Sequence, residues 1–393
     1  MMARLTRAQQ QERTRAAVLA AAREEFAEHG YADAKVDRIA ERAELTRGAV
    51  YSNFPGKRAL YLAVLVDSVE HADAAGTPSS PGPAEAPPPS GLAEAMGAFA
   101  RVWLERLPLT GDTPAGGRLQ SRSLTGLFDD EPGRTALAQV TALEGLLLAL
   151  ALESHAPYGA GRTRLVRLAE LALTLLAGAG HLADAAPGFG DPFDVARACR
   201  HLADLDLADA WDPPYLPYVT AAHLVREPWE PPPGLPDLIT GRRAGFEADG
   251  VIAILGTGRL EAAEEAVRAA RPGDRVTVAV VTGDPAEIGR LLRLRIGDLA
   301  GCLRRAFAPE ARPRLRLVLD DGAAVASAAG IPDPGDATEA AVRIRAGTIL
   351  SRARGRGAAH AAATADDSPA DGPATDGSPT GGSPATWPGG AGE

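Results

Sequence analysis

Residues 46–57, TRGAVYSNFPGK, decide how the beginning of this 393-residue chain folds. Thr46 is a favourable N-cap, so the stretch predicts a short helix from about Arg47 to Asn53. Apolar side chains on this helix would face inward, while hydroxyls, a guanidinium, a phenol and an ammonium would remain outside, suited to phosphates and base edges. The inward set is Ala49, Val50 and Phe54, and the outward set is Thr46, Arg47, Gly48, Tyr51, Ser52 and Lys57.

Two further helices are predicted immediately upstream. Apolar residues recur at helical spacing over residues 13–29, and Gly30 follows as a stop signal. Three apolar residues between 36 and 40 share one face of a short helix, and AEL at 43–45 makes a tight turn. Two short helices joined by such a turn form the helix-turn-helix plan, in which the second helix lies in the major groove of DNA.

The charge distribution supports this interpretation. The whole chain carries a formal net charge of −10, with a pI of about 5.3. Residues 1–60, however, contain eleven Lys and Arg against eight Asp and Glu, a net charge of +3, so the remainder carries −13. A basic face on one domain is typical of nucleic-acid binding, and Lys35 is a further candidate contact within this N-terminal head.

The segment VDRIAERAELTRGAVYSNFPGKRALYLAVL, residues 36–65, resembles the TetR (AcrR-like) family of transcriptional regulators. The resemblance implies a DNA-binding head, contacts from Ala49 and the outward set above, and a duplex operator as partner. Glu44 is a departure, because the family commonly has glycine in this turn. The residues that carry the resemblance are Ile39, Ala40, Ala43, Leu45, Thr46, Gly48, Tyr51, Phe54, Lys57 and Leu60.

The next part of the chain predicts a helical body. Residues 58–75 are typical of a long connecting helix, and a proline-rich loop, GTPSSPGPAEAPPPSG, follows at 76–91. The pattern is then helical from 92 to 207 and looks like the ligand-binding and dimerisation half of the same family. The resemblance therefore covers residues 10–207, and implies a homodimer and a repressor that a small-molecule effector releases from its operator.

Specific residues can be assigned to these two roles. A wide apolar stripe near the end of the body is expected to form the dimer interface, which doubles the length of DNA read. The stripe consists of Leu165, Leu168, Leu171, Leu175 and Leu176. The expected walls of an effector pocket are Trp103, Leu124, Phe128 and Leu147.

Beyond residue 212 the periodicity changes. The sequence predicts a proline-rich linker at 211–242, an α/β domain at 243–356 and a disordered tail at 357–393. With a helix-turn-helix head at 1–56 and a ligand-binding and dimerisation domain at 57–210, the N-terminal two-thirds are all α. The predicted strands are 250–255, 275–281, 314–319, 340–345 and 348–353, alternating with helices at 259–270, 285–307 and 322–329.

Two interpretations of the α/β domain compete with an unplaced α/β fold. LRLVLDDGAAVASAAGI followed by AAVRIRAGTILSRARG resembles the second half of a thioredoxin- or peroxiredoxin-like domain, but GTGRLEAAEEA stands where such enzymes carry their cysteine. Alternatively, Gly256 and Gly258 in ILGTGRLE lie between a strand and a helix, where backbone amides could hold a phosphate. Glu261 replaces the third glycine of that fingerprint, and its charge would oppose a pyrophosphate.

The remaining composition argues against catalysis. Cys199 and Cys302 are far apart, without a CxxC or a metal-ligand spacing, so we expect no disulfide framework, no metal site, no cofactor and no enzyme activity. The N-terminus lacks an apolar signal region, and we expect no membrane span and a reducing cytoplasm as the location. The alternative function is a redox sensor or thiol-dependent enzyme that acts through the α/β domain.

Overall fold

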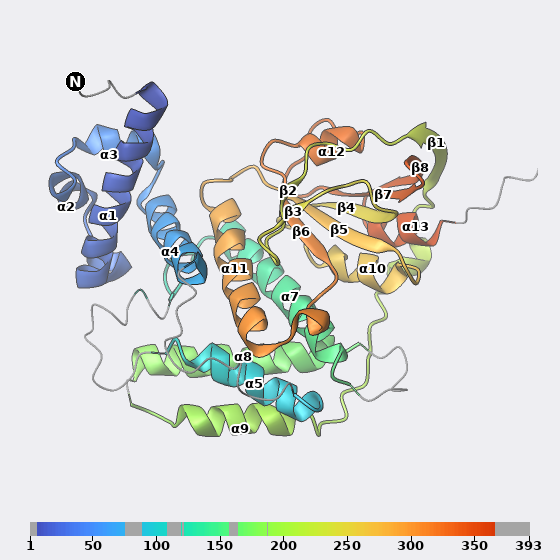
Figure 1. Cartoon of the computed structure of the whole chain (residues 1–393), viewed down its shortest axis with the longest axis horizontal. Coiled ribbons are helices and arrows are strands. Elements are labelled where there is room, and N and C mark those ends of the chain that lie inside the picture. Colours follow the sequence, from blue (N-terminus) through green and yellow to red (C-terminus); the bar gives the residue numbers. More distant parts are fainter. Residues whose placement is uncertain are drawn as a thin grey trace, which may run out of the picture.

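The computed structural model describes residues 6–74, 89–107, 119, 122–156, 164–186 and 188–365 (Figure 1). Most of the proline-rich loop at 76–91 and the part of the predicted tail from 366 onward lie outside the described residues.

Three helices build the head: α1 (Arg7–Asp33), α2 (Val36–Arg42) and α3 (Arg47–Asn53). The side chain of Thr46 accepts a hydrogen bond from the backbone N–H of Ala49, 3.2 Å, which confirms it as the N-cap of α3. The turn between α2 and α3 holds Glu44 at φ 54°, in the left-handed region that favours glycine. Glu44 therefore departs from the family pattern at a strained position.

The helical body follows the head. Its helices pack around a core of Leu, Ala and aromatic side chains, with α5 against α9 and α7 against α8. Their bounds are α4 (Lys57–Ala74), α5 (Leu92–Leu104), α7 (Glu131–Glu153), α8 (Val166–Ala185) and α9 (Pro192–Leu202).

Two helices, α7 and α8, are long and apolar enough to cross a membrane by length and composition alone. From the sequence we expected no membrane span, and length and composition alone do not establish one. Most of the apolar stretch of α7 is buried inside the protein, so packing in the core accounts for its composition. A smaller share of α8 is buried, and its outer face exposes Leu171 and Leu182.

A six-stranded mixed sheet forms the second half of the chain, in the order β1-β8-β7-β4-β5-β6. Strands β4, β5 and β6 are parallel, whereas β7 and β8 form an antiparallel hairpin that pairs with β4. A small ribbon of β2 (Leu235–Pro236) and β3 (Arg243–Ala244) lies beside it. The sheet strands are β1 (His223–Pro228), β4 (Gly250–Gly256), β5 (Arg275–Val281), β6 (Arg316–Leu319), β7 (Glu339–Arg345) and β8 (Thr348–Arg354).

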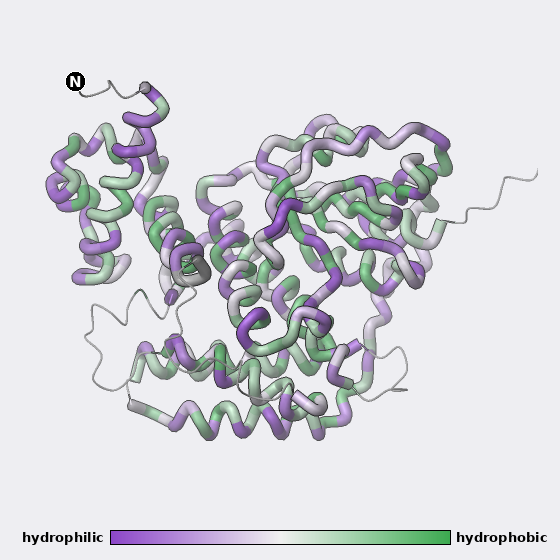
Figure 2. The backbone as a smooth tube through the Cα atoms, viewed as in Figure 1, coloured by the Kyte–Doolittle hydropathy of each residue, from purple (hydrophilic) through white to green (hydrophobic). Residues whose placement is uncertain are grey.

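The helices of this half are α10 (Ala262–Ala269), α11 (Ile288–Ala306), α12 (Ala324–Ala328) and α13 (Ala358–Thr364), with single 3₁₀ turns at Leu216–Tyr218 and Pro309–Ala311. The strand-then-helix alternation expected from the sequence is thus confirmed as an α/β architecture. The central strands β4 and β5 are almost entirely buried, as expected for strands that are covered on both faces, and hydrophobic residues are frequent in this part of the tube in Figure 2.

Two expected boundaries were wrong. The proline-rich stretch at 211–242 contains β1, which pairs with β8, and Trp229, whose buried Nε1 donates to the carbonyl of Phe246, 2.7 Å. Ordered structure also continues past 357, because α13 packs its alanines on Val251, Ala341 and Ala353 of the sheet. Small residues facing small residues allow this close approach, although the segment lacks the large apolar groups that sequence reasoning sought.

Helix α11 connects the two halves of the molecule. It lies against α4, α7 and α5 of the helical body as well as against the sheet (Figure 1). One continuous core therefore joins body and sheet, and the α/β half is not a separate unit attached by a linker.

Candidate nucleic-acid interface

The two faces of α3 differ as its sequence pattern predicts. Val50 and Phe54 are fully buried among the apolar side chains of the head, and Ala49 is half-buried. The polar side is open to solvent and presents Thr46, Arg47, Gly48, Tyr51 and Ser52. A short, rigidly seated helix with one exposed polar face has the shape of a major-groove reader.

Arg47 and Tyr51 form a pair on that exposed face. The guanidinium lies 5.5 Å from the centre of the Tyr51 ring and 3.5 Å from its hydroxyl, and it also forms an ion pair with Asp37 on α2, 3.2 Å. The hydrogen bond with Tyr51, and next the charge of Asp37, raise the pKa of Arg47. The pair is therefore preorganised, and a DNA phosphate or base would compete with Asp37 for the guanidinium.

The two lysines expected to contact DNA have different surroundings. Lys35 is exposed, and its Nζ makes no hydrogen bond to any residue within the described ranges. Lys57 is half-buried: its Nζ donates to the carbonyl of Ala32, 2.9 Å, and lies 4.9 Å from the centre of the Tyr31 ring. Burial lowers the pKa of Lys57. Lys57 thus ties the start of α4 to the end of α1, a contact that its sequence position did not reveal.

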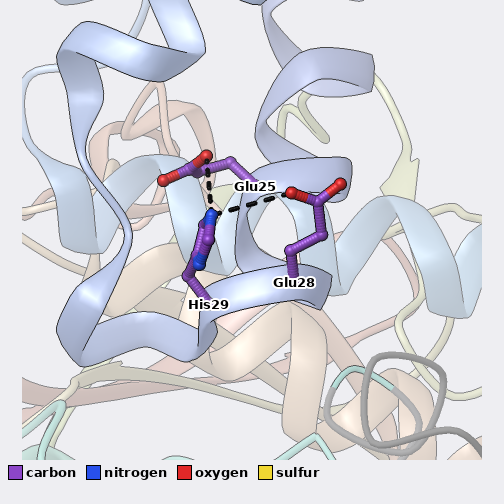
Figure 3. A group of neighbouring side chains, drawn as sticks. All are labelled: Glu25, Glu28 and His29. Atoms are coloured by element: carbon purple, nitrogen blue, oxygen red, sulfur yellow. Dashed lines mark ion pairs between the residues drawn. The ribbon is translucent and has the colours of Figure 1, made fainter.

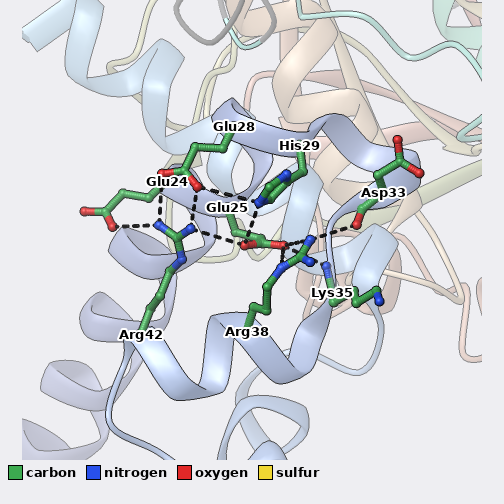
Figure 4. Close-up of polar contacts among 8 residues, drawn as sticks. All are labelled: Glu24, Glu25, Glu28, His29, Asp33, Lys35, Arg38 and Arg42. Atoms are coloured by element: carbon green, nitrogen blue, oxygen red, sulfur yellow. Dashed lines mark hydrogen bonds and ion pairs between the residues drawn. The ribbon is translucent and has the colours of Figure 1, made fainter.

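A buried carboxylate that sequence reasoning missed fixes α2 on α1. Glu25 is fully buried, and its Oε1 accepts hydrogen bonds from the backbone N–H of Lys35, 3.0 Å, and from Nε of Arg38, 2.6 Å (Figure 4). Burial raises the pKa of Glu25, but these hydrogen bonds outweigh it and hold the pKa below its ordinary value. The available signal was a charged residue on the inward face of α1, next to Phe26.

The same corner holds Glu25, Glu28 and His29, a group of a kind that can bind a metal ion (Figure 3). Nε2 of His29 lies 3.7 Å from a Glu25 carboxylate oxygen and 3.6 Å from one of Glu28. Arg42, however, already hydrogen-bonds Glu28 and lies 3.5 Å from Glu25. The guanidinium neutralises these carboxylates, so we interpret the group as part of the ion-pair network that holds the head together.

The comparisons with known proteins agree with this geometry. The family model described as bacterial regulatory proteins, tetR family, matches residues 18–64. Residues 18–64 are therefore similar to the N-terminal domain of the tetR family. The match spans α2, α3 and most of α1, and extends into α4, so this TetR-type head contains every exposed residue of α3 described above.

Individual relatives match the same part of the chain. HTH-type transcriptional regulator SrpR of Pseudomonas putida is 48% identical over 64 residues, which is 16% of this chain and 30% of that protein. An uncharacterised HTH-type regulator, TtgW, also of Pseudomonas putida, is 48% identical over 64 residues, 16% of this chain and 47% of that protein. The chain thus spans less than half the length of these curated relatives.

Among solved structures, a TetR transcriptional regulator from Rhodococcus sp. RHA1 aligns with 51% of this chain and 99% of its own, at 19% identity and a TM-score of 0.31.

The residues expected to wall an effector pocket are divided between two hydrophobic clusters. Trp103 and Leu147 are buried in the core shared by α5, α7 and α11, whereas Leu124 and Phe128 pack with the core of the TetR-type head and α4. A cavity of about 310 Å³ lies elsewhere, and Leu150, Arg164, Val267, Arg271 and Arg314 are among its lining residues. Trp103, Phe128 and Leu147 are buried, and Leu124 is half-buried.

The two thiols are poorly placed for chemistry. Cys199 and Cys302 are both buried, and burial raises the pKa of Cys199 to about 11. A reactive cysteine needs a stabilised thiolate and access to solvent.

Proposed function

We propose that this protein is a DNA-binding transcriptional regulator of the TetR type, a repressor that acts in the cytoplasm and has no enzyme activity. The observation that carries the proposal is the exposed Arg47–Tyr51 pair on α3, held on a TetR-type head. Thr46, Gly48, Ala49 and Ser52 would follow the groove beside it, and Lys35 and Lys57 would meet phosphates.

We further propose that two copies pair through α8 and α9. Of the five leucines assigned to this role, Leu168 and Leu176 are buried inside the chain, which corrects their assignment, while Leu165 and Leu175 are half-buried and Leu171 is exposed. Other large apolar side chains lie exposed on or near the same helices. They are Leu182, Phe189, which is 69% exposed, and Phe193, which is 74% exposed. Exposed apolar side chains gathered on two adjacent helices support an isologous dimer interface.

For the α/β half we propose a redoxin-like module without the catalytic thiol. The parallel pair of β4 and β5 and the β7–β8 hairpin support this assignment. The hairpin turns at Ala346 and Gly347, which have φ of 48° and 71°. The buried cysteines weigh against the alternative of a thiol-dependent enzyme or redox sensor. A small-molecule effector stays part of the proposal, and the four residues first expected to wall its pocket are divided between two hydrophobic clusters.

The test is selection of bound duplexes from a random pool by the full chain, followed by affinity measurements with Arg47→Ala. Arg134→Ala is a matched control, because both guanidinium side chains are about equally exposed, 60% and 61%, and each pairs with one carboxylate. We expect Arg47→Ala to weaken binding to the selected duplex at least about tenfold, and Arg134→Ala to leave it unchanged. Absence of any enriched duplex would overturn the proposal.

A further inference from the structure

The side chain of Arg58 lies where three parts of the molecule meet. Arg58 is in the first turn of α4, in the part of that helix that belongs to the TetR-type head of residues 18–64. Its guanidinium forms ion pairs with Glu287, the N-cap of α11, and with Asp130, the N-cap of α7. It also donates to the carbonyl of Leu127, 3.2 Å. One side chain thus joins the head, the helical body and the α/β half.

A second arginine, Arg290 of α11, contacts the end of α3. Arg290 donates to the carbonyl of Ala59, 3.1 Å, and its guanidinium lies 5.5 Å from the centre of the Phe54 ring. Arg15 of α1 lies 4.9 Å from the same ring centre. Phe54 is the C-cap of α3 and is fully buried, so the end of α3 is in contact with both α1 and α11.

Apolar packing reinforces these contacts. Ile288, Leu291 and Leu294 of α11 are buried in the same hydrophobic cluster as Phe54 and the inner face of α4. The other sides of α11 contribute to the core of the helical body and of the sheet. Arg295 of α11 is ion-paired with the buried Glu144 of α7. A rotation or shift of α11 would therefore disturb the head and the body together.

The beginning of α11 is in turn tied to the sheet. Glu287 donates its backbone N–H to the carboxylate of Asp284, 2.9 Å, and Asp336 accepts hydrogen bonds from Gly283 N–H, 3.1 Å, and from Thr257, 2.7 Å. Thr257 follows β4 and Gly283 follows β5, so this chain of contacts starts at the carboxyl ends of the parallel strands. That edge is where open α/β sheets bind ligands.

We propose that Arg58 and Glu287 are positioning residues through which the α/β half sets the orientation of the TetR-type head, so that operator binding is controlled from the α/β half. This inference rests on the proposed DNA-binding function. The proposed route runs through α11, which packs in the same core as Trp103 and Leu147 of the helical body. Arg58 touches no DNA in this account, and acts by holding α4.

The experiment compares three isosteric charge removals in the full chain. Glu287→Gln breaks the pair between α11 and Arg58, and Asp130→Asn breaks the pair between the body and Arg58. Asp321→Asn is the matched control, because Asp321 pairs with Arg293 of the same helix α11, 2.7 Å, away from Arg58. Affinity for the selected duplex is one readout.

The second readout does not depend on DNA. Spin labels at Glu41→Cys in the head and Asp333→Cys in the α/β half, both exposed positions, report the distance between these parts. Measurements use labelled chains diluted with unlabelled ones, so that only distances within one chain count. The native cysteines are buried and react poorly. If the wild type binds no duplex, the proposed function fails, while the distances still test the positioning role.

We expect Glu287→Gln to broaden the distance distribution and to weaken duplex binding at least about fivefold, a typical coupling between sites. Asp130→Asn should have a smaller effect on both, and Asp321→Asn should stay within about twofold of the wild type. Should Glu287→Gln fail to fold, Arg290→Lys is expected to act in the same direction. The proposal is overturned if Glu287→Gln, or Arg290→Lys in its place, behaves like the Asp321→Asn control in both readouts. It is also overturned if Asp130→Asn has a larger effect than that variant.

Discussion

Helices α3 and α11 use their side chains in opposite ways. Helix α3 has seven residues, and its polar groups face solvent on one side. Helix α11 has nineteen residues and is buried against the head, the body and the sheet at once. The helix proposed to read DNA thus has one face open to solvent, whereas most of α11 is buried or half-buried between the parts of the molecule that it contacts.

Their charged groups differ in the same way. Arg47 on α3 is 60% exposed and has the exposed carboxylate of Asp37 as ion-pair partner, so DNA can displace that partner. Arg295 on α11 pairs with the fully buried Glu144; burial raises the pKa of Glu144, and the charge of Arg295 opposes that shift. Removing one member of a buried pair is costly, because it leaves an uncompensated charge. We therefore expect substitutions on α11 to affect folding and substitutions on α3 to affect binding.

The largest effect is expected from Leu291→Ala. Leu291 of α11 is fully buried in the cluster shared with the head, and such truncations cost about 2–5 kcal/mol of unfolding free energy. Leu224→Ala on the exposed strand β1 is the control, with a cost near zero. Denaturant unfolding monitored by circular dichroism measures both. A cost below about 0.5 kcal/mol for Leu291→Ala would mean that α11 does not hold the two halves together.

In contrast to Leu291→Ala, Tyr51→Ala should change DNA recognition and leave stability unchanged. Because Tyr51 is 39% exposed on α3, its loss should leave the unfolding free energy within about 0.5 kcal/mol of the wild type. Sequence preference at one symmetric pair of operator positions should relax by about 1–3 kcal/mol, as measured by competition between single-base variants of the selected duplex. Unchanged preference at every position would remove Tyr51 from the reading surface.

Substitutions of Lys35 and Lys57 should differ in how they change the salt dependence of duplex affinity. Lys35 is exposed, so Lys35→Gln should lower the slope of log K against log salt by about two units for a dimer. Lys57 is engaged with Ala32 inside the head, so Lys57→Gln should change the slope less and cost about 1 kcal/mol of stability. A larger slope change for Lys57→Gln than for Lys35→Gln would mean that Lys57 makes the stronger phosphate contact despite its hydrogen bond to Ala32.

A smaller effect concerns Glu25 and acid. The pKa of Glu25 in the folded protein lies below its ordinary value of 4.5. Its ionised form therefore contributes stability that is complete above about pH 4.5 and is lost as the pH falls through the lowered pKa. Glu25→Gln should lower the free energy of unfolding at neutral pH, and this free energy should then fall less on acidification than in the wild type. Glu41→Gln, on the exposed face of α2, should show the same stability and the same acid response as the wild type. An acid response in Glu25→Gln equal to that of the wild type would contradict the role of this carboxylate.

The head could be predicted from the sequence because its determinants are local. Thr46 caps α3, and the apolar spacing sets which face is buried, so the helix bounds 47–53 were predicted correctly. Strand β5 was also predicted at its observed bounds, 275–281, because its continuous β-branched run is typical of a doubly covered strand.

The parts that were not predicted depend on contacts between residues far apart in the sequence. Glu287 and Arg58 are more than two hundred residues apart, and nothing near either residue indicates the other. Strand β1 was hidden in a proline-rich stretch because only its pairing with β8 makes it a strand. The effector-pocket residues stay a prediction, and their division between two hydrophobic clusters depends on packing between segments far apart in the sequence.

Hydroxyl-radical footprinting of the full chain on its selected duplex tests the central claim most directly. The account predicts two protected segments on the same face of the duplex, related by a two-fold axis and separated by about one helical turn or a multiple of it. Protection should disappear with Arg47→Ala and persist with Arg134→Ala. A single isolated segment, uniform protection along the duplex, or a footprint that survives Arg47→Ala would contradict the claim that paired α3 helices read this DNA.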